Sequence, residues 1–255
     1  MAMLIFCIRR LSILLYVVSV LCFVSPAFSA AGDVDGGDGD VGIDDSWDVK
    51  ALTSYLPLYD SALQVSHEDT FIRQGVALSP KEGEVLAFSQ QRKIAILSKP
   101  LLSEGQFLYR ENAGICWAIN KPFPATLVLT ESSIIQKSDD GSEQIIDASK
   151  NPMIAELTGL FTSIFAGDSQ KILSAFDVYL LQGQPSLMPK AGWMLGMKPK
   201  ADLMVGIPSE IRLLGKENLR WAWFSNKAGD QTLIEFADVN GSQSENVAAR
   251  CFGRI

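Results

Sequence analysis

Short segments in which apolar and polar positions alternate follow one another through most of the chain. In residues 84–91, Leu86 and Phe88 fall on one side while Val85 and Ala87 fall on the other, which is the two-residue period of a β-strand. Further strands are predicted at 94–97, 106–109, 115–119, 126–130, 132–136, 142–146, 178–181, 193–197, 207–214, 218–224 and 231–236. Short turns separate many of them, so the pattern favours one antiparallel meander.

Helical spacing replaces this alternation near the start of the chain. Residues 48–63 form the first predicted helix, because apolar side chains recur there at steps of three and four. These side chains are Leu52, Tyr55, Leu56, Tyr59 and Leu63. Pro57 interrupts the segment, so we expect a kink or two short pieces.

A second, strongly apolar helix begins at Asn151-Pro152, since asparagine is a good N-cap and proline suits the first helical position. One stripe of its surface contains Ile154, Leu157, Phe161 and Phe165, and a wider apolar side adds Met153, Leu160 and Ile164. Gly167 ends this helix, and Asp168 is expected to cap a short helix that runs to Phe176.

The two ends of the chain differ in composition from the middle. Residues 1–29 are typical of a secretory signal, with Arg9 and Arg10 before an apolar run and cleavage expected after Ser29; the alternative is an uncleaved anchor. Residues 30–45 are a Gly/Asp-rich leader that we expect to be disordered, because the register of a calcium-binding loop is absent. A single domain is predicted at 46–239, and residues 240–255 are predicted to be a polar tail.

Charge and cysteine content narrow the classes of function. The formal charge is −7, and the acidity comes mostly from the leader, so the chain lacks the basic stripe of a nucleic-acid-binding protein. Beyond the signal, only Cys116 and Cys251 remain. They are able to form one disulfide in an oxidising compartment. The alternative, which we favour from the sequence, is two unpaired thiols, one in a strand and one in the tail.

Residues with catalytic chemistry are sparse. His67 is the only histidine and lies in a polar segment, residues 66–83, that is predicted to be a loop, so neither a catalytic triad nor a zinc site is predicted. Glu68-Asp69 and Asp139-Asp140 are adjacent carboxylates, but nothing identifies two carboxylates that face each other across a cleft. No catalytic residue, metal or cofactor is therefore predicted, and a secreted hydrolase is the weakest hypothesis.

The order of several short motifs resembles the LolA-like family of periplasmic outer-membrane lipoprotein carriers. The matching residues are Phe88-Ser89-Gln90, Lys99-Pro100-Leu101, Ser103, Gly105, Phe107 to Tyr109, Trp117, Lys121-Pro122-Phe123-Pro124, Asp139-Asp140-Gly141, Pro152, Ala166-Gly167-Asp168, Trp193, Lys198-Pro199 and Gly229-Asp230-Gln231-Thr232. The resemblance covers roughly residues 84–238. It implies an α+β, mainly β fold, in which an incomplete antiparallel β-barrel (half-barrel) and its covering helices enclose an apolar cavity.

Carriers of this type bind acyl chains, which need a water-free slot lined by apolar side chains. The candidate wall residues are Phe88, Phe107, Trp117, Leu127, Leu129, Trp193 and Trp223, and the candidate lid residues are Ile154, Leu157, Phe161 and Phe165. An ordinary packed core is the alternative interpretation of these residues. Carriers also place an Arg-Pro before the tryptophan strand, where this chain has Arg110-Glu111. Arg110 is therefore only a candidate gate.

The resemblance implies a periplasmic, monomeric carrier from a Gram-negative bacterium. Such a protein receives lipoproteins or related lipids from an inner-membrane donor and passes them to an outer-membrane acceptor, without enzymatic chemistry or nucleic acid. The alternative is a periplasmic lipid-sensing or regulatory binding module on the same fold.

Overall fold

The computed structural model describes residues 63–65, 83–138, 141–150, 152–180, 192–200, 208–239 and 244–253. The predicted signal, the leader, His67 and nearly all of the first predicted helix lie outside these residues. Leu63, expected at the end of that helix, instead begins strand β1 (Leu63–Val65), where it pairs with Leu180.

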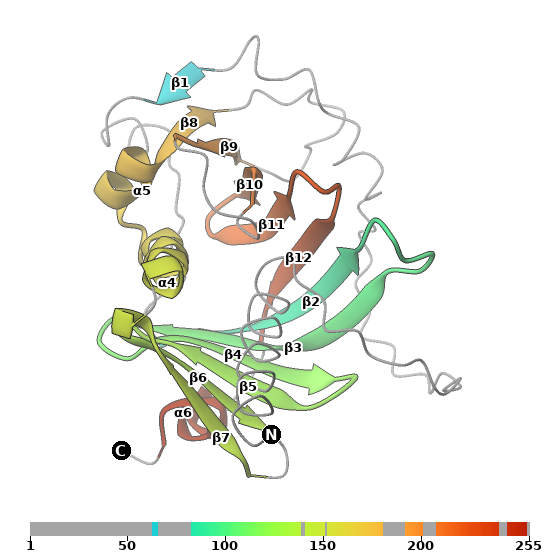
Figure 1. Cartoon of the computed structure of the whole chain (residues 1–255), viewed down its shortest axis with the longest axis vertical. Coiled ribbons are helices and arrows are strands. Elements are labelled where there is room, and N and C mark those ends of the chain that lie inside the picture. The colour runs from blue at the N-terminus through green and yellow to red at the C-terminus, as the bar shows by residue number, and fades with distance from the viewer. Residues whose placement is uncertain are drawn as a thin grey trace, which may run out of the picture.

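One strongly curved antiparallel sheet dominates the protein (Figure 1). After β1, its strands are β2 (Val85–Lys93), β3 (Leu101–Arg110), β4 (Gly114–Lys121), β5 (Ala125–Leu129), β6 (Ser133–Ser138), β7 (Glu143–Asp147), β8 (Phe176–Leu180), β9 (Trp193–Pro199), β10 (Glu210–Gly215), β11 (Leu219–Ser225) and β12 (Gln231–Asp238). The spatial order is β1-β8-β9-β10-β11-β12-β2-β3-β4-β5-β6-β7. The sheet ends at β1 and β7 without closing, which confirms the predicted incomplete barrel.

The strand expected at residues 94–97 is wrong, because this segment is the turn between β2 and β3. The backbone N–H of Leu97 donates to the carbonyl of Ile94 across 3.0 Å and closes the turn. Strand β2 instead continues to Lys93 through polar residues that suggested a break in the sequence. Pairing with β12 on one side and β3 on the other outweighs the low strand propensity of this polar segment.

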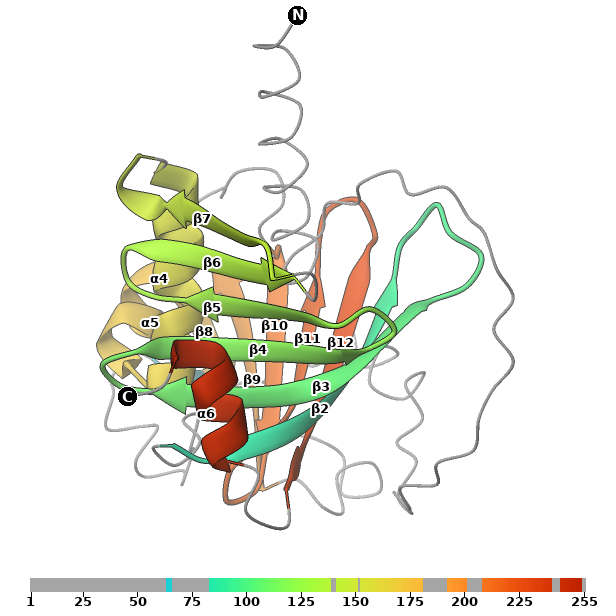
Figure 2. The same ribbon diagram turned by 90° about the horizontal axis from the view of Figure 1, so that it is seen from below.

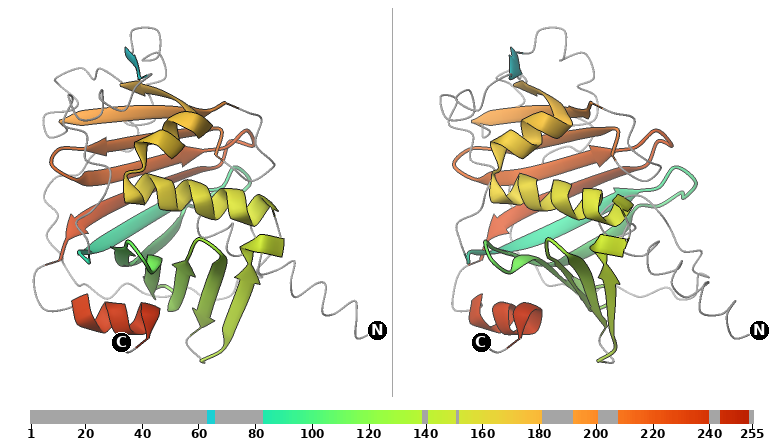
Figure 3. Two further views of the ribbon diagram at one scale, coloured as in Figure 1. Left: turned by 90° about the vertical axis from the view of Figure 1, so that its left-hand side faces the viewer. Right: turned by 60° about the vertical axis from the view of Figure 1, so that its left-hand side comes forward.

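The helices cover opposite faces of the sheet. After the short 3-10 helix η1 (Ala148–Lys150), α4 (Pro152–Ala166) crosses the concave side and continues into α5 (Ser169–Ala175), as Figure 3 shows. Helix α6 (Ser244–Phe252) lies on the convex side, against β3, β4 and β5 (Figure 2). The two predicted central helices are thus confirmed, although the second ends before Phe176, which opens β8.

The predicted polar tail at 240–255 is wrong where α6 forms. Val247, Ala248 and Cys251 share one side of this helix and are buried against the convex layer of the sheet. Their spacing of one and three residues is too short a pattern to stand out in a polar segment.

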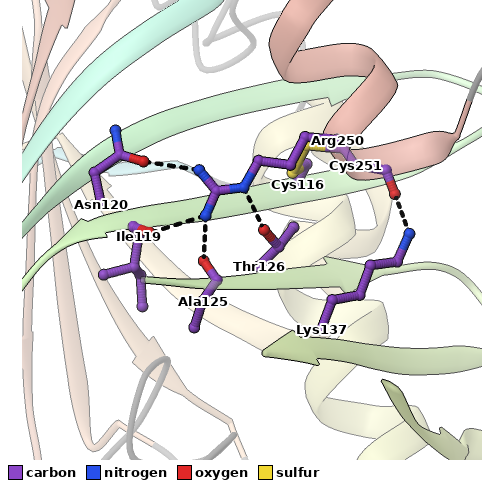
Figure 4. The surroundings of a disulfide bond; sticks show 8 residues. All are labelled: Cys116, Ile119, Asn120, Ala125, Thr126, Lys137, Arg250 and Cys251. Carbon is purple, nitrogen blue, oxygen red and sulfur yellow. Dashed lines mark hydrogen bonds between the residues drawn. A yellow bond between two sulfur atoms is a disulfide. The ribbon is translucent and has the colours of Figure 1, made fainter. Parts of the chain in front are cut away.

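A disulfide joins Cys251 to Cys116 on β4, which corrects the expectation of unpaired thiols (Figure 4). The Arg250 guanidinium adds hydrogen bonds to Thr126 and Asn120, both at 2.8 Å, and to two backbone carbonyls of the β4–β5 turn region. Lys137 donates from Nζ to the Cys251 carbonyl at 3.1 Å. The end of the chain is thereby fastened to the convex face covalently and by charge-assisted hydrogen bonds.

None of the helices in the described residues is both long and apolar enough to cross a membrane.

Candidate functional site: the concave face beneath helix α4

The main apolar cluster of the protein lies between the concave face of the sheet and α4. The strand register places Leu86, Phe107, Trp117 and Leu127 side by side across β2 to β5. All four belong to this cluster and are buried. Neighbouring strands present alternate residues to the same face, so one row of apolar side chains runs across the curved sheet.

Aromatic rings form the centre of this wall. The Phe88 ring centroid lies 4.6 Å from that of Trp117, and the Phe107 ring meets Trp117 edge-on at 5.3 Å. Gly105 stands opposite Phe88 on β3. A Cβ atom at that position would lie only 2.9 Å from the Phe88 ring and 2.1 Å from the Ala118 carbonyl oxygen. Glycine is therefore required for the ring to lie across β3.

Helix α4 contacts the wall directly through aromatic rings. Phe165 lies 4.5 Å from Phe107 and 6.1 Å from Phe236 between ring centroids, and Phe161 lies 6.0 Å from Phe224. Ile154 and Ile164 on the same helix are also buried in the cluster. The rings of wall and lid touch in this structure, so the side chains themselves occupy the space between them.

The hydroxyl groups of α4 make their hydrogen bonds within the helix. Thr158 is fully buried, and its Oγ1 donates to the Ile154 carbonyl at 2.9 Å. The Thr162 and Ser163 hydroxyls donate to carbonyls four residues earlier at 2.7 Å and 2.6 Å. Hydroxyls satisfied in this way need no partner on the sheet. The contacts of α4 with the wall that we describe are therefore apolar.

The structure brings most of the predicted wall and lid residues into one cluster. These residues are Phe88, Phe107, Trp117, Leu127, Leu129, Trp193, Ile154, Phe161 and Phe165. Leu157 belongs to α4, but its side chain lies outside the described part of the protein. Trp193 is tied to the sheet at the start of β9, where its indole Nε1 donates to the Lys216 carbonyl at 3.1 Å.

Trp223 does not belong to the wall. On strand β11, Ala222 and Phe224 belong to the concave cluster. Because successive side chains of a strand point to opposite faces, Trp223 between them faces the convex side. There the Arg212 guanidinium lies 4.7 Å from the Trp223 ring centroid, while its Nε donates to Glu210 at 2.7 Å. This is a cation–π contact backed by a largely buried ion pair.

Phe224 and Phe236 belong to the same concave cluster but were missed by the sequence analysis. Both are buried and contact the lid, Phe224 through Phe161 and Phe236 through Phe165. Large rings occupy both faces of β11, so alternation alone could not decide which face of that strand is concave. For Phe236 the signal was present, because β12 alternates between buried and half-buried positions along its length.

Several polar atoms are buried at or near the wall without a hydrogen-bond partner in the described residues. They are the indole Nε1 of Trp117 and the side-chain carbonyl oxygens of Gln90 and Gln136. Gln136 stands opposite Leu127, and Gln90 stands opposite Ile234, which belongs to the apolar cluster. Buried donors and acceptors without partners carry a free-energy cost, so they mark positions where a ligand with an ester or amide group would gain hydrogen bonds.

A polar cleft of about 360 Å³ opens beside the C-terminal end of α4. The β3–β4 turn, the β5–β6 turn and the α4–α5 connection line it, with Glu111, Asn112, Thr162, Asp168 and Lys171 among the lining residues. Arg110, the candidate gate, is not among them. It alternates with Tyr109, which belongs to the concave cluster, so Arg110 emerges on the convex face. The assignment of Arg110 as a possible gate stays a prediction.

The carboxylates with shifted pKa values lie outside the concave cluster, and each shift has a local cause. The Ser149 hydroxyl lowers the pKa of Asp147, and the Lys171 backbone N–H lowers the pKa of Asp168. Burial raises the pKa of Glu235, which stands opposite Trp221. Within the described segments, no group of three or more His, Cys, Asp or Glu side chains is placed to hold a metal ion.

Comparison with known proteins identifies the family of the chain. A family model described as outer membrane lipoprotein carrier protein LolA-like matches residues 68–251. A LolA superfamily protein from Nitrosomonas europaea has 9% identity and a TM-score of 0.39, covering 68% of this chain and 92% of its own.

A second solved structure, a DUF1329 family protein from Desulfovibrio piger, has 9% identity and a TM-score of 0.33, covering 69% and 92% of the two chains. No individually curated protein matches the chain. The family model spans most of the chain, including β2 to β12 and the cysteine of α6. The chain therefore belongs to the LolA-like family of outer membrane lipoprotein carrier proteins.

Proposed function

We propose that this protein is a periplasmic carrier that encloses the acyl chains of lipoproteins or related lipids beneath α4 and moves them toward the outer membrane. The observation that supports this most is that the described contacts between α4 and the aromatic wall are between apolar side chains. A helix whose hydroxyls are satisfied internally leaves the wall without breaking hydrogen bonds to it. What it loses is apolar contact, which an acyl chain is able to replace.

The energetics of this exchange favour a long, unbranched apolar ligand. Each methylene transferred from water contributes about 0.8 kcal/mol, so about ten methylenes supply at most roughly 8 kcal/mol. Separating Phe165 from Phe107 and Phe161 from Phe224 consumes part of that free energy. Binding is therefore expected to be reversible, which a carrier requires if it is to release its cargo.

Two features of the chain support the proposed periplasmic location. Residues 1–29 are typical of a secretory signal, and disulfides such as Cys116–Cys251 persist in oxidising compartments like the periplasm. A carrier in this position takes cargo from an inner-membrane donor and gives it to an outer-membrane acceptor. It works as a monomer and without an enzymatic step.

A fluorescent fatty-acyl probe tests the site under α4. In the mature protein, Phe161→Glu should weaken probe binding roughly tenfold or more, because a carboxylate would be buried among rings. Ala155→Glu is the matched control, since Ala155 is exposed on the same helix and the change adds the same charge. Circular dichroism establishes that both variants keep the sheet. Equal probe affinity of the folded Phe161→Glu variant and the control would refute the assignment of α4 as the lid.

Lipids that accompany the protein distinguish a carrier from a regulatory module. Mass spectrometry of protein purified without detergent should find acylated molecules if the concave site carries cargo. A protein partner that co-purifies reproducibly, with no extractable lipid and no probe binding, favours the sensing or regulatory function instead.

A further inference from the structure

Exposed large apolar side chains gather at one end of the sheet. The described residues contain six of them, and five lie on the β2–β3 hairpin or the β4–β5 turn. They are Ile96, Leu97, Leu101, Leu102 and Phe123. Ile96 is 87% exposed and Phe123 is 73% exposed. A single exposed leucine needs no explanation, but such a concentration marks an interaction surface.

The two turns project from the same end of the molecule. Strand β3 starts at the hairpin and β4 returns to it, so Glu104 stands opposite Lys121 beside the β4–β5 turn. The Lys121 Nζ and a Glu104 carboxylate oxygen are 3.2 Å apart. Figure 1 shows the β2–β3 hairpin and the β4–β5 turn directed to the right of the view. We call the five apolar residues of the first two turns the hairpin patch.

Basic side chains surround the hairpin patch in a protein whose net charge is −7. Lys93 and Lys99 lie on the hairpin, and Lys121 and Lys227 lie on the two neighbouring turns; all four are exposed. The acids described at these turns are Glu104, which pairs with Lys121, and Asp230, which is buried. This end of the protein is therefore positive, opposite in sign to the whole chain.

The base of the hairpin is fastened to the sheet. Asp230 Oδ1 accepts a hydrogen bond from the Ala95 backbone N–H at 2.9 Å, and Asn226 Nδ2 donates to the other oxygen of Asp230 at 3.1 Å. Ile94 is only 5% exposed, whereas Ile96, two residues later, is almost fully exposed. The sheet thus presents the apolar tip at a defined position.

We propose that the hairpin patch docks the protein on the surface of an anionic phospholipid bilayer. Apolar side chains enter the boundary between headgroups and acyl chains, while lysines contact lipid phosphates. A lysine near an anionic surface strengthens binding roughly fivefold. The exposed Lys93 and Lys99 on the hairpin argue for lipid phosphates rather than for an apolar protein groove, which would not neutralise their charge. The proposal does not depend on acyl binding beneath α4, because the patch lies outside the concave cluster.

Vesicle flotation of the mature protein tests this proposal. The wild type should float with vesicles of phosphatidylglycerol and phosphatidylcholine, and added salt should weaken the association. Ile96→Ser combined with Leu102→Ser should reduce binding roughly tenfold, because both side chains are exposed and apolar. Ile145→Ser is the matched control. Ile145 is 64% exposed but lies on the edge strand β7, outside the hairpin patch, so its replacement should leave vesicle binding unchanged.

A second variant separates the contribution of charge. Lys93→Gln with Lys99→Gln should weaken binding to the anionic vesicles and leave fatty-acyl probe binding unchanged. Three outcomes overturn the proposal: no flotation of the wild type with anionic vesicles, equal flotation of the hairpin variant and the Ile145→Ser control, or flotation only when the vesicles contain a membrane protein. The last outcome would identify the hairpin patch as a protein-docking site.

Discussion

Removing the disulfide between Cys116 and Cys251 should cost much stability while leaving the concave site intact. The bond joins residues 135 positions apart, and closing a loop of that length lowers the entropy of the unfolded chain by an amount worth about 5 kcal/mol. That figure is an upper limit, because measured losses usually fall below the chain-entropy value. For Cys116→Ala with Cys251→Ala we expect a loss of about 4 kcal/mol, or roughly 10 °C in melting temperature for a domain of this size.

Denaturant unfolding followed by tryptophan fluorescence measures this loss, with linear extrapolation to water. A reducing agent should lower the stability of the wild type to nearly that of the variant and leave the variant unchanged. This control separates the effect of the bond from that of the two side-chain replacements. If mass spectrometry confirms the bond in the wild type and the variant still unfolds within about 1 kcal/mol of it, the loop-entropy argument is refuted.

The same variant should bind a fatty-acyl probe with unchanged affinity. Cys116 and Cys251 belong to the convex layer, whereas Phe107 and Phe165 meet on the concave side. A probe affinity that falls together with stability would show that α6 supports the site through the sheet, contrary to the separation of the two layers.

Two carboxylates provide further predictions. Asp168 caps α5 by accepting from the Lys171 backbone N–H at 3.0 Å, so Asp168→Ala should cost about 1 kcal/mol in thermal unfolding, and Asp168→Asn a few tenths. Because this contact lowers the pKa of Asp168, its stabilisation should be lost as the pH falls through the folded-state pKa. Burial raises the pKa of Glu235, so stability should fall as the pH rises through that pKa. The free energy of unfolding of the Glu235→Gln variant should therefore exceed that of the wild type near neutral pH, but not below pH 4.5.

Alternation predicted the strands best where one face is clearly buried. Strand β12 alternates between buried and half-buried positions up to Ala237, and β2 alternates between buried and more exposed positions from Leu86 onward. Around residues 90–97 the same reasoning failed, because polar Gln90 and Arg92 are buried in β2 while apolar Ile96 is exposed at the turn. The strands that pair on either side decide whether such a position is buried or exposed. The sequence alone does not show which strands pair.

Membership of the concave cluster was largely predictable, because family resemblance and helical spacing both pointed to the same residues. The exception was β11, in which Trp221, Trp223 and Phe224 place large rings on both faces. For a strand covered on two sides, period alone does not distinguish inside from outside. The C-terminal helix was missed for a related reason, since the disulfide and Arg250, rather than a long apolar stripe, hold it in place.

The distribution of strong and weak contacts suits a carrier that opens on one side only. On the convex face, α6 is held by a disulfide and by hydrogen bonds from Arg250 and Lys137 to the sheet. On the concave face, the contacts that we describe between α4 and the wall are between apolar side chains. Apolar contact has no directional requirement, so an acyl chain is able to replace the contacts between α4 and the wall. An acyl chain cannot replace the covalent bond that holds α6. Under the proposed function, the sheet would keep its curvature while α4 exchanges ring contacts for cargo.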